Sequence, residues 1–390
     1  MSIVTFTSAL PHRDIEHAGG KYLSILLETL GAKHGTVVAP PLPNVVRAAS
    51  LPGHPRQTHI TAAVGFFTAS VENTLRRLDP GLPSFSVLGA LHNDPVARRL
   101  VKDATVIDLQ WQDSIRLAGA IRRLAPTATI VGTFHDVQSQ KYSRLARSAQ
   151  GRSKIKWTLA TRLAQLAERK AMRLLDRVVV FSTKDANLLP PGAPVTVVDP
   201  PLAAEKSPSH QPPATPRVVF VALLSRPENR EAALWLVQEV WPRVRAQVPT
   251  AQLDLVGAGA NHELEETIAA FPGVRNTGFV PDLDGVLADA TVAAVPVHEG
   301  AGVKFKTIEA LLAGIPVVTT SIGAEGIDPP SLFWGVADDA ATFAEHLVSS
   351  LLNGDKAQRR ADKAQQQVAS RYGPEAFVGK VRAVYGVGPQ

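Results

Sequence analysis

The stretch GAGVKFKTIEALLAGIPVVTT, residues 300–320, combines a glycine loop, an amphipathic segment and a β-rich run. A strand-like run ends near Pro296, just before it. Apolar residues return every three or four positions over 303–313, which predicts a helix. Gly314 then stands where a helix end favours a residue that tolerates positive φ. A strand, loop, helix and strand in this order indicate a parallel α/β domain.

The same alternation of strand-like and helical patterns extends over the whole chain. A first set of strand-like runs lies at 2–7, 60–64, 105–109, 129–133 and 178–181. A second set lies at 218–223, 252–256, 292–296 and 316–320. Strands that alternate with amphipathic stretches favour parallel sheets covered by helices on both faces, and 390 residues exceed the usual size of one core.

A tract rich in proline and serine divides the chain. Residues 200–216, PPLAAEKSPSHQPPATP, lack any hydrophobic period and are typical of a linker. We therefore expect an N-terminal domain over 1–199, the linker over 200–216, a C-terminal domain over 217–365 and terminal helices over 366–390 that cross back to the first domain. Ligands of open α/β sheets bind at the carboxyl ends of the strands, so the expected site lies between the two domains.

The composition excludes several classes of protein. Hydrophobic residues make up 45% and charged residues 19%, as in globular chains. The chain has no cysteine, which excludes disulfides, thiolate metal sites and a cysteine nucleophile. The first residues lack the basic and apolar regions of a signal peptide, and the apolar runs are too short to span a membrane. We expect a cytoplasmic protein.

The glycine loop and the helix that follows it form a candidate anion site. Gly300 and Gly302 allow close approach of the backbone, and a helix N-terminus offers unpaired amide groups to an anion. Lys304 and Lys306 add positive charge, and Glu309 lies one helical turn after Lys306. This arrangement suits a nucleoside diphosphate. An ordinary surface pair of Lys306 and Glu309 beside a turn fits the spacing equally well.

The stretch 300–320 also resembles the donor-binding motif of family-4 retaining glycosyltransferases, which have the GT-B architecture. The resemblance extends in the family's order over most of the chain and is weakest over 40–100. The similar segments are His17-Ala18-Gly19-Gly20, Phe134-His135-Asp136, 168–189, 220–241 and 253–283. It implies two Rossmann-like parallel-sheet domains that face each other across a cleft.

The resemblance also assigns roles to individual residues. Lys306 matches the lysine on the donor diphosphate, Glu309 the glutamate on the ribose, and His135 the histidine near the transferred sugar; these three form the expected catalytic set. Further expected donor contacts are Gly19, Gly20, Arg226, Phe279, Val280, Glu299, Gly300, Gly302 and Lys304.

The sequence departs from the family pattern in two places. Many members carry a glutamate eight positions before the one that matches Glu309, where this chain has Ala301, and Glu299 is out of register by two. Many members also carry an Arg and a Lys after the first strand of the second domain, where this chain offers only Arg226. We therefore rank Lys304 and Lys306 above Arg226 as phosphate ligands.

One segment is strongly basic. Residues 141–177 hold eleven basic and two acidic residues, whereas the remaining chain is slightly acidic. A solvated helix face is the ordinary explanation of such a run. Attraction to an anionic membrane surface is the sharper one, and we favour it over nucleic acid because no nucleic-acid-binding module is recognisable.

Other patterns that suggest metals or cofactors are weak. Asp282 and Asp284 resemble a metal-binding pair, but their place before a helix favours an N-cap. Gly257 and Gly259 lack the third small residue of a dinucleotide fingerprint. The histidines show no metal-ligand spacing. We expect no metal and no cofactor beyond the nucleotide-sugar substrate.

Together these observations predict a metal-independent glycosyltransferase. It would move a sugar from a nucleoside diphosphate sugar to a hydroxyl of an acceptor sugar, lipid-linked sugar or small molecule, with retention of configuration, in polysaccharide, glycolipid or glycoconjugate synthesis. Two alternatives stay open: a nucleotide-sugar epimerase of the same architecture, and a non-catalytic nucleotide-sugar-binding protein.

Overall fold

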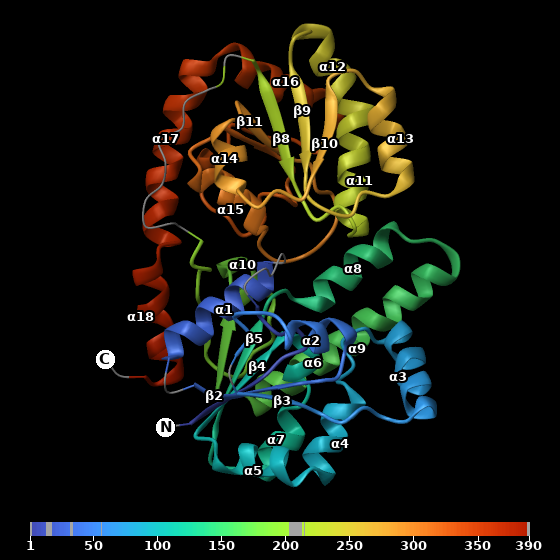
Figure 1. Ribbon diagram of the computed structural model, residues 1–390, viewed down its shortest axis with the longest axis vertical. Helices are drawn as coiled ribbons and strands as arrows, with labels where there is room; N and C mark the ends of the chain where they lie inside the picture. Colours follow the sequence, from blue (N-terminus) through green and yellow to red (C-terminus); the bar gives the residue numbers. More distant parts are fainter. Residues whose placement is uncertain are drawn as a thin grey trace. The chain divides into compact units, whose positions relative to one another are not determined.

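The computed structural model describes residues 2–12, 18–31, 34–55, 57–202, 213 and 215–387. The chain separates into two compact units. Figure 1 colours it from the N-terminus in blue to the C-terminus in red. The N-terminal unit comprises Met1–Pro200 together with Phe377–Gln390, and the C-terminal unit comprises Pro201–Ala376. Most of the expected linker, 200–216, lies outside the described residues.

The N-terminal unit contains a seven-stranded sheet in the order β3-β2-β1-β4-β5-β6-β7. All of its strand pairs are parallel. The strands are β1 (Ile3–Phe6), β2 (His34–Ala39), β3 (Thr58–Ile60), β4 (Val106–Gln110), β5 (Thr129–Phe134), β6 (Arg177–Val180) and β7 (Val195–Val197).

Helices connect these strands and cover the sheet. They are α1 (Ala18–Leu30), α2 (Pro43–Ala48), α3 (Phe66–Leu78), α4 (Phe85–Asn93), α5 (Pro95–Asp103), α6 (Trp111–Ile115), α7 (Ala118–Leu124), α8 (Gln138–Ser148), α9 (Gly151–Leu174) and α10 (Thr183–Leu188). The central strands β1 and β4 are fully buried, as expected for a parallel sheet with both faces covered.

The C-terminal unit contains a six-stranded parallel sheet in the order β10-β9-β8-β11-β12-β13. The strands are β8 (Arg217–Val221), β9 (Gln252–Val256), β10 (Val274–Gly278), β11 (Val292–Val295), β12 (Val317–Thr319) and β13 (Gly335–Val336). The α-helices are α11 (Pro227–Trp235), α12 (Trp241–Gln247), α13 (His262–Ala270), α14 (Leu283–Ala288), α15 (Phe305–Leu312), α16 (Ala340–Leu352) and α17 (Gly354–Arg371). A π-helical turn, η2 (Leu236–Val240), joins α11 to α12, and a 3-10 turn, η3 (Pro330–Leu332), precedes β13.

The prediction of two Rossmann-like domains with parallel sheets is confirmed. The predicted helix over 303–313 begins later, at Phe305, because Lys304 has extended backbone and forms the N-cap. Gly314 follows this helix with φ 71°, as expected. Four strands were not predicted: β2, β7, β10 and β13. Strands β7 and β13 are short, and β10 alternates between half-buried and exposed residues without an apolar run. Strand β2 has six residues, but its apolar run is only Val37–Ala39, and the strand predicted over 60–64 overlaps β3 only at Ile60.

The last helix, α18 (Pro374–Tyr385), packs almost entirely within the N-terminal unit. Lys380 forms an ion pair with Asp199 at 2.7 Å, and Arg177 donates to the carbonyl of Val384. The Tyr385 hydroxyl donates to buried Asp108 at 2.7 Å. The C-terminal residues therefore complete the core of the first unit.

Candidate active site

In both sheets the strand order reverses beside the first strand of the unit. The reversal falls between β1 and β4 in the N-terminal unit and between β8 and β11 in the C-terminal unit. Ligands of open α/β sheets bind outside the carboxyl ends of strands at such a point. The expected residues His135, Lys306 and Glu309 all follow strands at or next to these reversals.

Lys306 is held by Asn229. Lys306 follows β11, whereas Asn229 follows β8, on the other side of the reversal in strand order. The Lys306 Nζ donates to Oδ1 of Asn229 at 2.6 Å, and the Asn229 amide donates in turn to the carbonyl of Leu223 at 2.8 Å. The ammonium also lies 5.2 Å from the ring centroid of Phe220 on β8. The half-buried Lys306 side chain therefore has one defined position.

The electrostatic surroundings of Lys306 disfavour its charge. Burial lowers its pKa to about 7, and the positive charges of Lys304 and Arg226 act in the same direction, against the weaker opposite effects of Glu228 and Glu309. Cations crowded at a helix start are stabilised by an anion placed among them. Lys306 is therefore half-buried among other cations, which differs from the exposed surface pair that its spacing with Glu309 also allowed.

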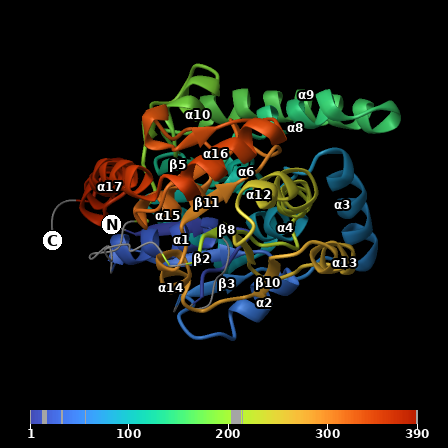
Figure 2. The same ribbon diagram turned by 90° about the horizontal axis from the view of Figure 1, so that it is seen from above.

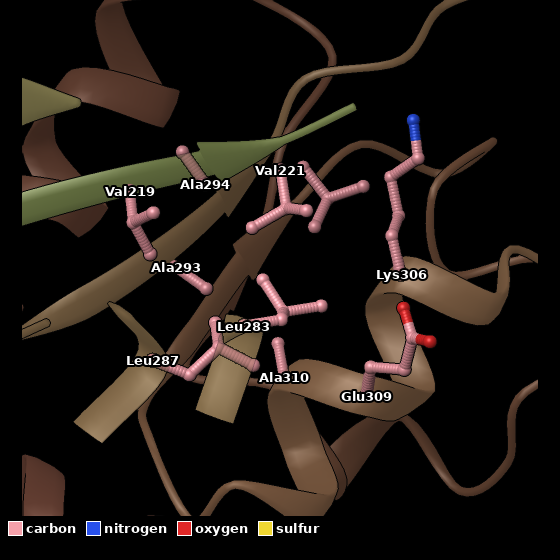
Figure 3. Close-up of a pocket in the computed structure, with 10 residues that line it drawn as sticks. Val219, Val221, Leu283, Leu287, Ala293, Ala294, Lys306, Glu309 and Ala310 are labelled. Atoms are coloured by element: carbon pink, nitrogen blue, oxygen red, sulfur yellow. The ribbon is translucent and has the colours of Figure 1, made fainter. Parts of the chain in front are cut away.

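Lys306 and Glu309 line the same small pocket. Its other walls are apolar and come from β8, β11, α14 and α15; they are Val219, Val221, Leu283, Leu287, Ala293, Ala294, Val295 and Ala310. Figure 3 shows the two charged side chains next to each other on α15, with the Lys306 amino group directed away from the apolar residues. The pocket thus joins an apolar floor to one cation and one carboxylate.

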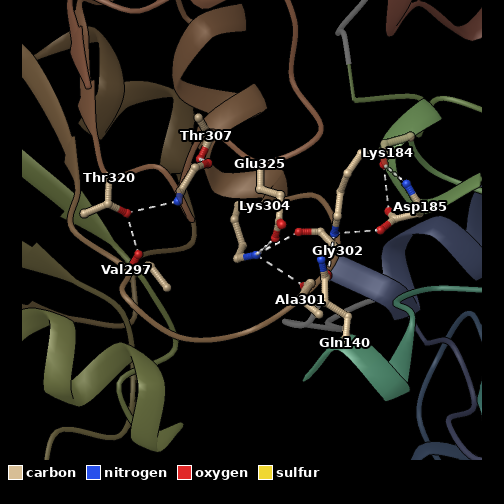
Figure 4. Close-up of polar contacts among 12 residues, drawn as sticks. Gln140, Lys184, Asp185, Val297, Ala301, Gly302, Lys304, Thr307, Thr320 and Glu325 are labelled. Carbon is tan, nitrogen blue, oxygen red and sulfur yellow. Dashed lines mark hydrogen bonds and ion pairs between the residues drawn. The ribbon is translucent and has the colours of Figure 1, made fainter. Parts of the chain in front are cut away.

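The glycine loop before α15 is fixed by internal hydrogen bonds. Gly300 and Gly302 have φ of 118° and 68°, conformations that other residues rarely adopt. Lys304 donates to the carbonyls of Ala301 at 3.2 Å and Gly302 at 2.7 Å and lies 4.0 Å from Glu325 (Figure 4). The structure therefore places Lys304 on its own loop, where it supports the loop conformation.

Further buried hydroxyls hold the ends of this loop and helix. Thr307 donates to the carbonyl of Gly323 at 2.8 Å, and Thr320 donates to the carbonyl of Val297 (Figure 4). Thr320 also accepts from the amide of Gly323 at 3.0 Å. These bonds fasten the start of α15 to the segment after β12.

The remaining expected donor contacts of the C-terminal unit are less closely grouped. Phe279 is 59% exposed, whereas Val280 packs on the core. Glu299 is half-buried, and burial together with Glu231 and Glu228 raises its pKa. Glu299 therefore lies near other carboxylates, which act together with burial against its charged form.

His135 follows β5 and lies among aromatic rings of the N-terminal unit. Its ring stacks on Trp111, with centroids 4.1 Å apart, and contacts Tyr22 and Phe181 edge-on at 5.4 Å and 5.1 Å. Its Nε2 makes a 2.9 Å hydrogen bond with Oε1 of Gln110. Aromatic rings therefore hold the imidazole from three sides, and its Nε2 is bonded to Gln110.

Glycine is required where α1 passes this cluster. A Cβ on Gly19 would lie 2.8 Å from Cζ2 of Trp111 and 3.2 Å from Nδ1 of His135. Trp111 itself has a φ of 63°, which is rare for a bulky residue and often marks functional sites. Gly20 lies buried beside Gly19 in the first turn of α1. His17 lies outside the described residues.

The patterns discounted above have ordinary structural roles. Asp282 caps α14 and accepts from the amide of Gly285 at 3.0 Å, which confirms the helix-cap prediction. Within the described ranges, three or more His, Asp or Glu side chains nowhere gather as they would to bind a metal. No helix in the described part of the chain is both long and apolar enough to cross a bilayer.

Several residues of these sites were not predicted. Asn229 belongs to the stretch 220–241, which resembles the family's, but nothing in the sequence marked it as a contact of Lys306. Gln110 and Trp111 belong to no recognisable motif. One signal was available: Asp108 interrupts the apolar run 105–109, and a charged residue in a buried strand usually has partners.

Comparison with known proteins assigns the C-terminal unit to a family. Residues 215–353 match the family described as Glycosyl transferases group 1. A relative described as an uncharacterized 44.6 kDa protein in the cps region of Klebsiella pneumoniae is 29% identical over 142 residues. That alignment spans 34% of this chain and 36% of the relative, about a third of each. The matched family segment contains Asn229, Lys306 and Glu309.

Solved structures resemble the whole chain. Sucrose-phosphate synthase from Thermosynechococcus elongatus aligns with a TM-score of 0.71 at 15% identity, covering 99% of this chain and 98% of that one. Anabaena Alr3699/HepE in complex with UDP aligns with a TM-score of 0.70 at 14% identity, covering 98% and 99%. The chain has the GT-B fold. The predicted resemblance to group 1 glycosyltransferases is confirmed for the C-terminal unit.

Proposed function

We propose that this chain transfers a sugar from a nucleoside diphosphate sugar to an acceptor hydroxyl, with the anion site around Lys306 holding the diphosphate. The observation that carries the proposal is the position of Lys306: bound to Asn229, crowded by Lys304 and Arg226, and inside the segment that matches the family. A diphosphate would relieve this crowding and accept charge-assisted hydrogen bonds.

The proposed mechanism uses no metal ion. Departure of the sugar leaves charge on the diphosphate, and Lys306 with the amides at the start of α15 would stabilise that charge. Glu309 would hold the ribose, and Gly19, Gly20 and His135 would contact the phosphates and the sugar. The acceptor oxygen forms its bond to the anomeric carbon on the face that the leaving group departs from, and its proton passes to a phosphate oxygen. The configuration is then retained.

Two observations on similar proteins support the substrate class. Alr3699/HepE was solved in complex with UDP-glucose, and the Klebsiella pneumoniae relative is described as lying in a cps region. We therefore infer a role in polysaccharide or glycoconjugate assembly.

The test is product analysis with UDP-, GDP- and ADP-sugars, with and without acceptor. A glycosyltransferase forms a glycosylated acceptor and releases the nucleoside diphosphate. An epimerase converts the donor without acceptor, and a binding protein leaves every donor unchanged; either result contradicts the proposal. Lys306→Ala should abolish transfer, and Lys356→Ala, an exposed lysine on α17, should not.

We further propose that α9 holds the enzyme at an anionic membrane surface, where a lipid-linked acceptor would lie. Helices α8 and α9 pack together as an antiparallel hairpin (Figure 2). The buried face of α9 carries mainly small residues, Ala160, Ala164 and Ala171. We call the opposite side its outer face: Ile155, Leu159, Arg162, Leu166, Arg169 and Arg173, spaced alternately four and three residues apart.

The outer face of α9 combines apolar and basic side chains. Ile155 is 71% and Leu166 59% exposed, and the three arginines between and after them are exposed as well. Helix α3, which packs on α9, carries Phe66 and Phe67 at 91% and 81% exposure. Apolar side chains flanked by arginines are typical of helices that lie in a membrane interface.

Vesicle sedimentation tests this docking. The wild type should bind vesicles with phosphatidylglycerol and not vesicles of phosphatidylcholine alone. Exchange of Ile155, Leu159 and Leu166 for serine should release it, whereas Leu352→Ser, at an exposed leucine on α16, should not. Equal binding by the triple variant, or binding of RNA or DNA in place of vesicles, would contradict the membrane proposal.

A further inference from the structure

The N-terminal unit buries a carboxylate directly behind the candidate active-site histidine. Asp108 lies on the central strand β4 and is fully buried. None of the ion pairs found among the described residues involves it. Its oxygens accept instead from neutral groups: Thr5 at 3.0 Å, Tyr385 at 2.7 Å and Gln110 at 2.9 Å. Burial raises its pKa to about 6, and these hydrogen bonds oppose the rise.

This carboxylate fixes the orientation of the Gln110 amide. An ionised carboxylate only accepts hydrogen bonds, so the NH2 group of Gln110 must face Asp108. The same NH2 group donates to the hydroxyl of Thr133 at 3.1 Å. The amide oxygen therefore faces the other way, toward His135, at 2.9 Å from Nε2.

The Gln110 oxygen in turn fixes the proton of the histidine. An amide oxygen accepts and cannot donate, so Nε2 of His135 must carry the hydrogen. In the neutral ring Nδ1 then holds the lone pair. Nδ1 lies toward Gly19, 3.2 Å from the position that a Cβ would take there. Stacking on Trp111 and edge contacts with Tyr22 and Phe181 keep the ring from turning over.

We propose that Asp108, acting through Gln110, holds His135 as the Nε2–H tautomer, so that Nδ1 faces the glycine loop as a hydrogen-bond acceptor for a sugar hydroxyl. Asp108 and Gln110 are positioning residues in this arrangement. Tyr385 is a third positioning residue, since its hydroxyl donates a hydrogen bond to Asp108. Helix α18, near the C-terminus, therefore acts on His135 through Asp108 and Gln110. The hydroxyl contact rests on the proposed function, whereas the tautomer does not.

Nitrogen NMR of the imidazole rings tests the tautomer on the protein alone. With His135 assigned by comparison with His135→Asn, the wild type at pH 7.5 should show a protonated Nε2 and an unprotonated Nδ1. Gln110→Leu should lose this preference. The matched control is Gln112→Leu, because Gln112 is also buried, two residues along, and its side-chain amide forms no hydrogen bond with the described residues. A wild-type Nδ1–H tautomer, or an unchanged spectrum in Gln110→Leu, overturns the proposal.

A second variant keeps the proposal falsifiable if Gln110→Leu folds poorly. Gln110→Glu preserves the shape but places a second carboxyl group 2.9 Å from Asp108, so the two carboxyls should share a proton and the changed charge beside the imidazole should alter the titration of His135. An unchanged titration of His135 in Gln110→Glu would show that residue 110 does not control the ring.

Kinetics separate this proposal from the proposed function. Gln110→Leu should lower kcat at least about tenfold, because Nδ1 carries a hydrogen in the other tautomer and can no longer accept from the sugar hydroxyl. Its affinity for the nucleoside diphosphate should stay unchanged, since Lys306 is untouched. If the wild type shows no turnover the proposed function fails, yet the NMR result still decides the tautomer.

Discussion

The Lys306 region and the His135 region both lie at or next to a reversal of strand order, yet their charged groups have different surroundings. Lys306 stands among other cations, and its pKa falls to about 7. Asp108, behind His135, receives hydrogen bonds from neutral donors on Thr5, Gln110 and Tyr385. In our proposal an incoming anion stabilises the first region, which we call the binding region, whereas the protein itself supplies the hydrogen bonds of the second, which we call the orientation region.

The largest expected effect concerns the binding region. Lys306→Ala removes the cation that would stabilise the leaving diphosphate, so kcat should fall about 10²–10³-fold. Steady-state kinetics with the accepted donor measure the loss. Asn229→Ala should produce a smaller fall, since it releases the lysine without removing its charge. A lower kcat in Asn229→Ala than in Lys306→Ala would show that the conformation around Asn229, and not the charge of Lys306, determines the rate.

The orientation region should be sensitive to shape. Gly19→Ala places a methyl group 2.8 Å from Trp111 and 3.2 Å from Nδ1 of His135, and the ring stack must shift. Misplacement of a reacting group by about 1 Å can reduce a rate by about 10²-fold, so kcat should fall by ten- to a hundredfold in order of magnitude. Gly89→Ala on α4 is the control, because a Cβ there meets nothing within 4 Å. Equal activity of the two variants would contradict a close fit at Gly19.

The pH dependence of donor affinity distinguishes the two regions further. A bound diphosphate favours the charged form of Lys306, whose pKa in the free protein is about 7. Affinity should therefore be greatest below pH 7 and fall up to roughly tenfold per pH unit above it, until the raised pKa of the complex is reached. Lys306→Arg keeps its charge at every such pH and should flatten the profile. A profile that is flat in the wild type would refute this account of Lys306.

The smallest effect should come from Tyr385→Phe. The Tyr385 hydroxyl lowers the pKa of Asp108, so its loss should move that pKa upward from about 6. Because ionised Asp108 orients Gln110, activity should be lost as the pH falls through this pKa, and the acid limb of kcat should shift to higher pH. Tyr142→Phe, whose hydroxyl bonds Gln138 instead, should leave the limb in place. An unshifted acid limb of kcat in Tyr385→Phe would show that α18 does not influence His135 through Asp108.

The difference between the regions also decides what the sequence could predict. Lys306, Glu309, Gly300 and Gly302 lie in one continuous stretch, so local spacing and charge were enough to group them. The strands beside the two reversals, β1, β4, β8 and β11, could also be predicted, because buried parallel strands are largely continuous apolar runs. Lys304 shows the limit of this reasoning: its charge was evident, but its bonds to the carbonyls of Ala301 and Gly302 were not.

The His135 region could not be assembled from sequence in the same way. Thr5, Asp108, Gln110, Thr133 and Tyr385 are brought together only by strand order and by the return of α18 to the N-terminal unit. No local period encodes such contacts across hundreds of positions. The basic charge of α9 was evident from the sequence, but the exposure of Ile155, Leu159 and Leu166 beside it was not, because α9 buries its alanines instead.

Titration calorimetry of UDP, GDP and ADP with the wild type and Lys306→Ala, in buffers of different ionisation enthalpy at pH 7.5, tests the central claim most directly. We predict that one of the three nucleotides binds the wild type with uptake of up to one proton, and that Lys306→Ala loses both the affinity and the proton uptake. Binding of equal strength to the variant, or binding without proton uptake, would contradict the assignment of Lys306 to the donor diphosphate.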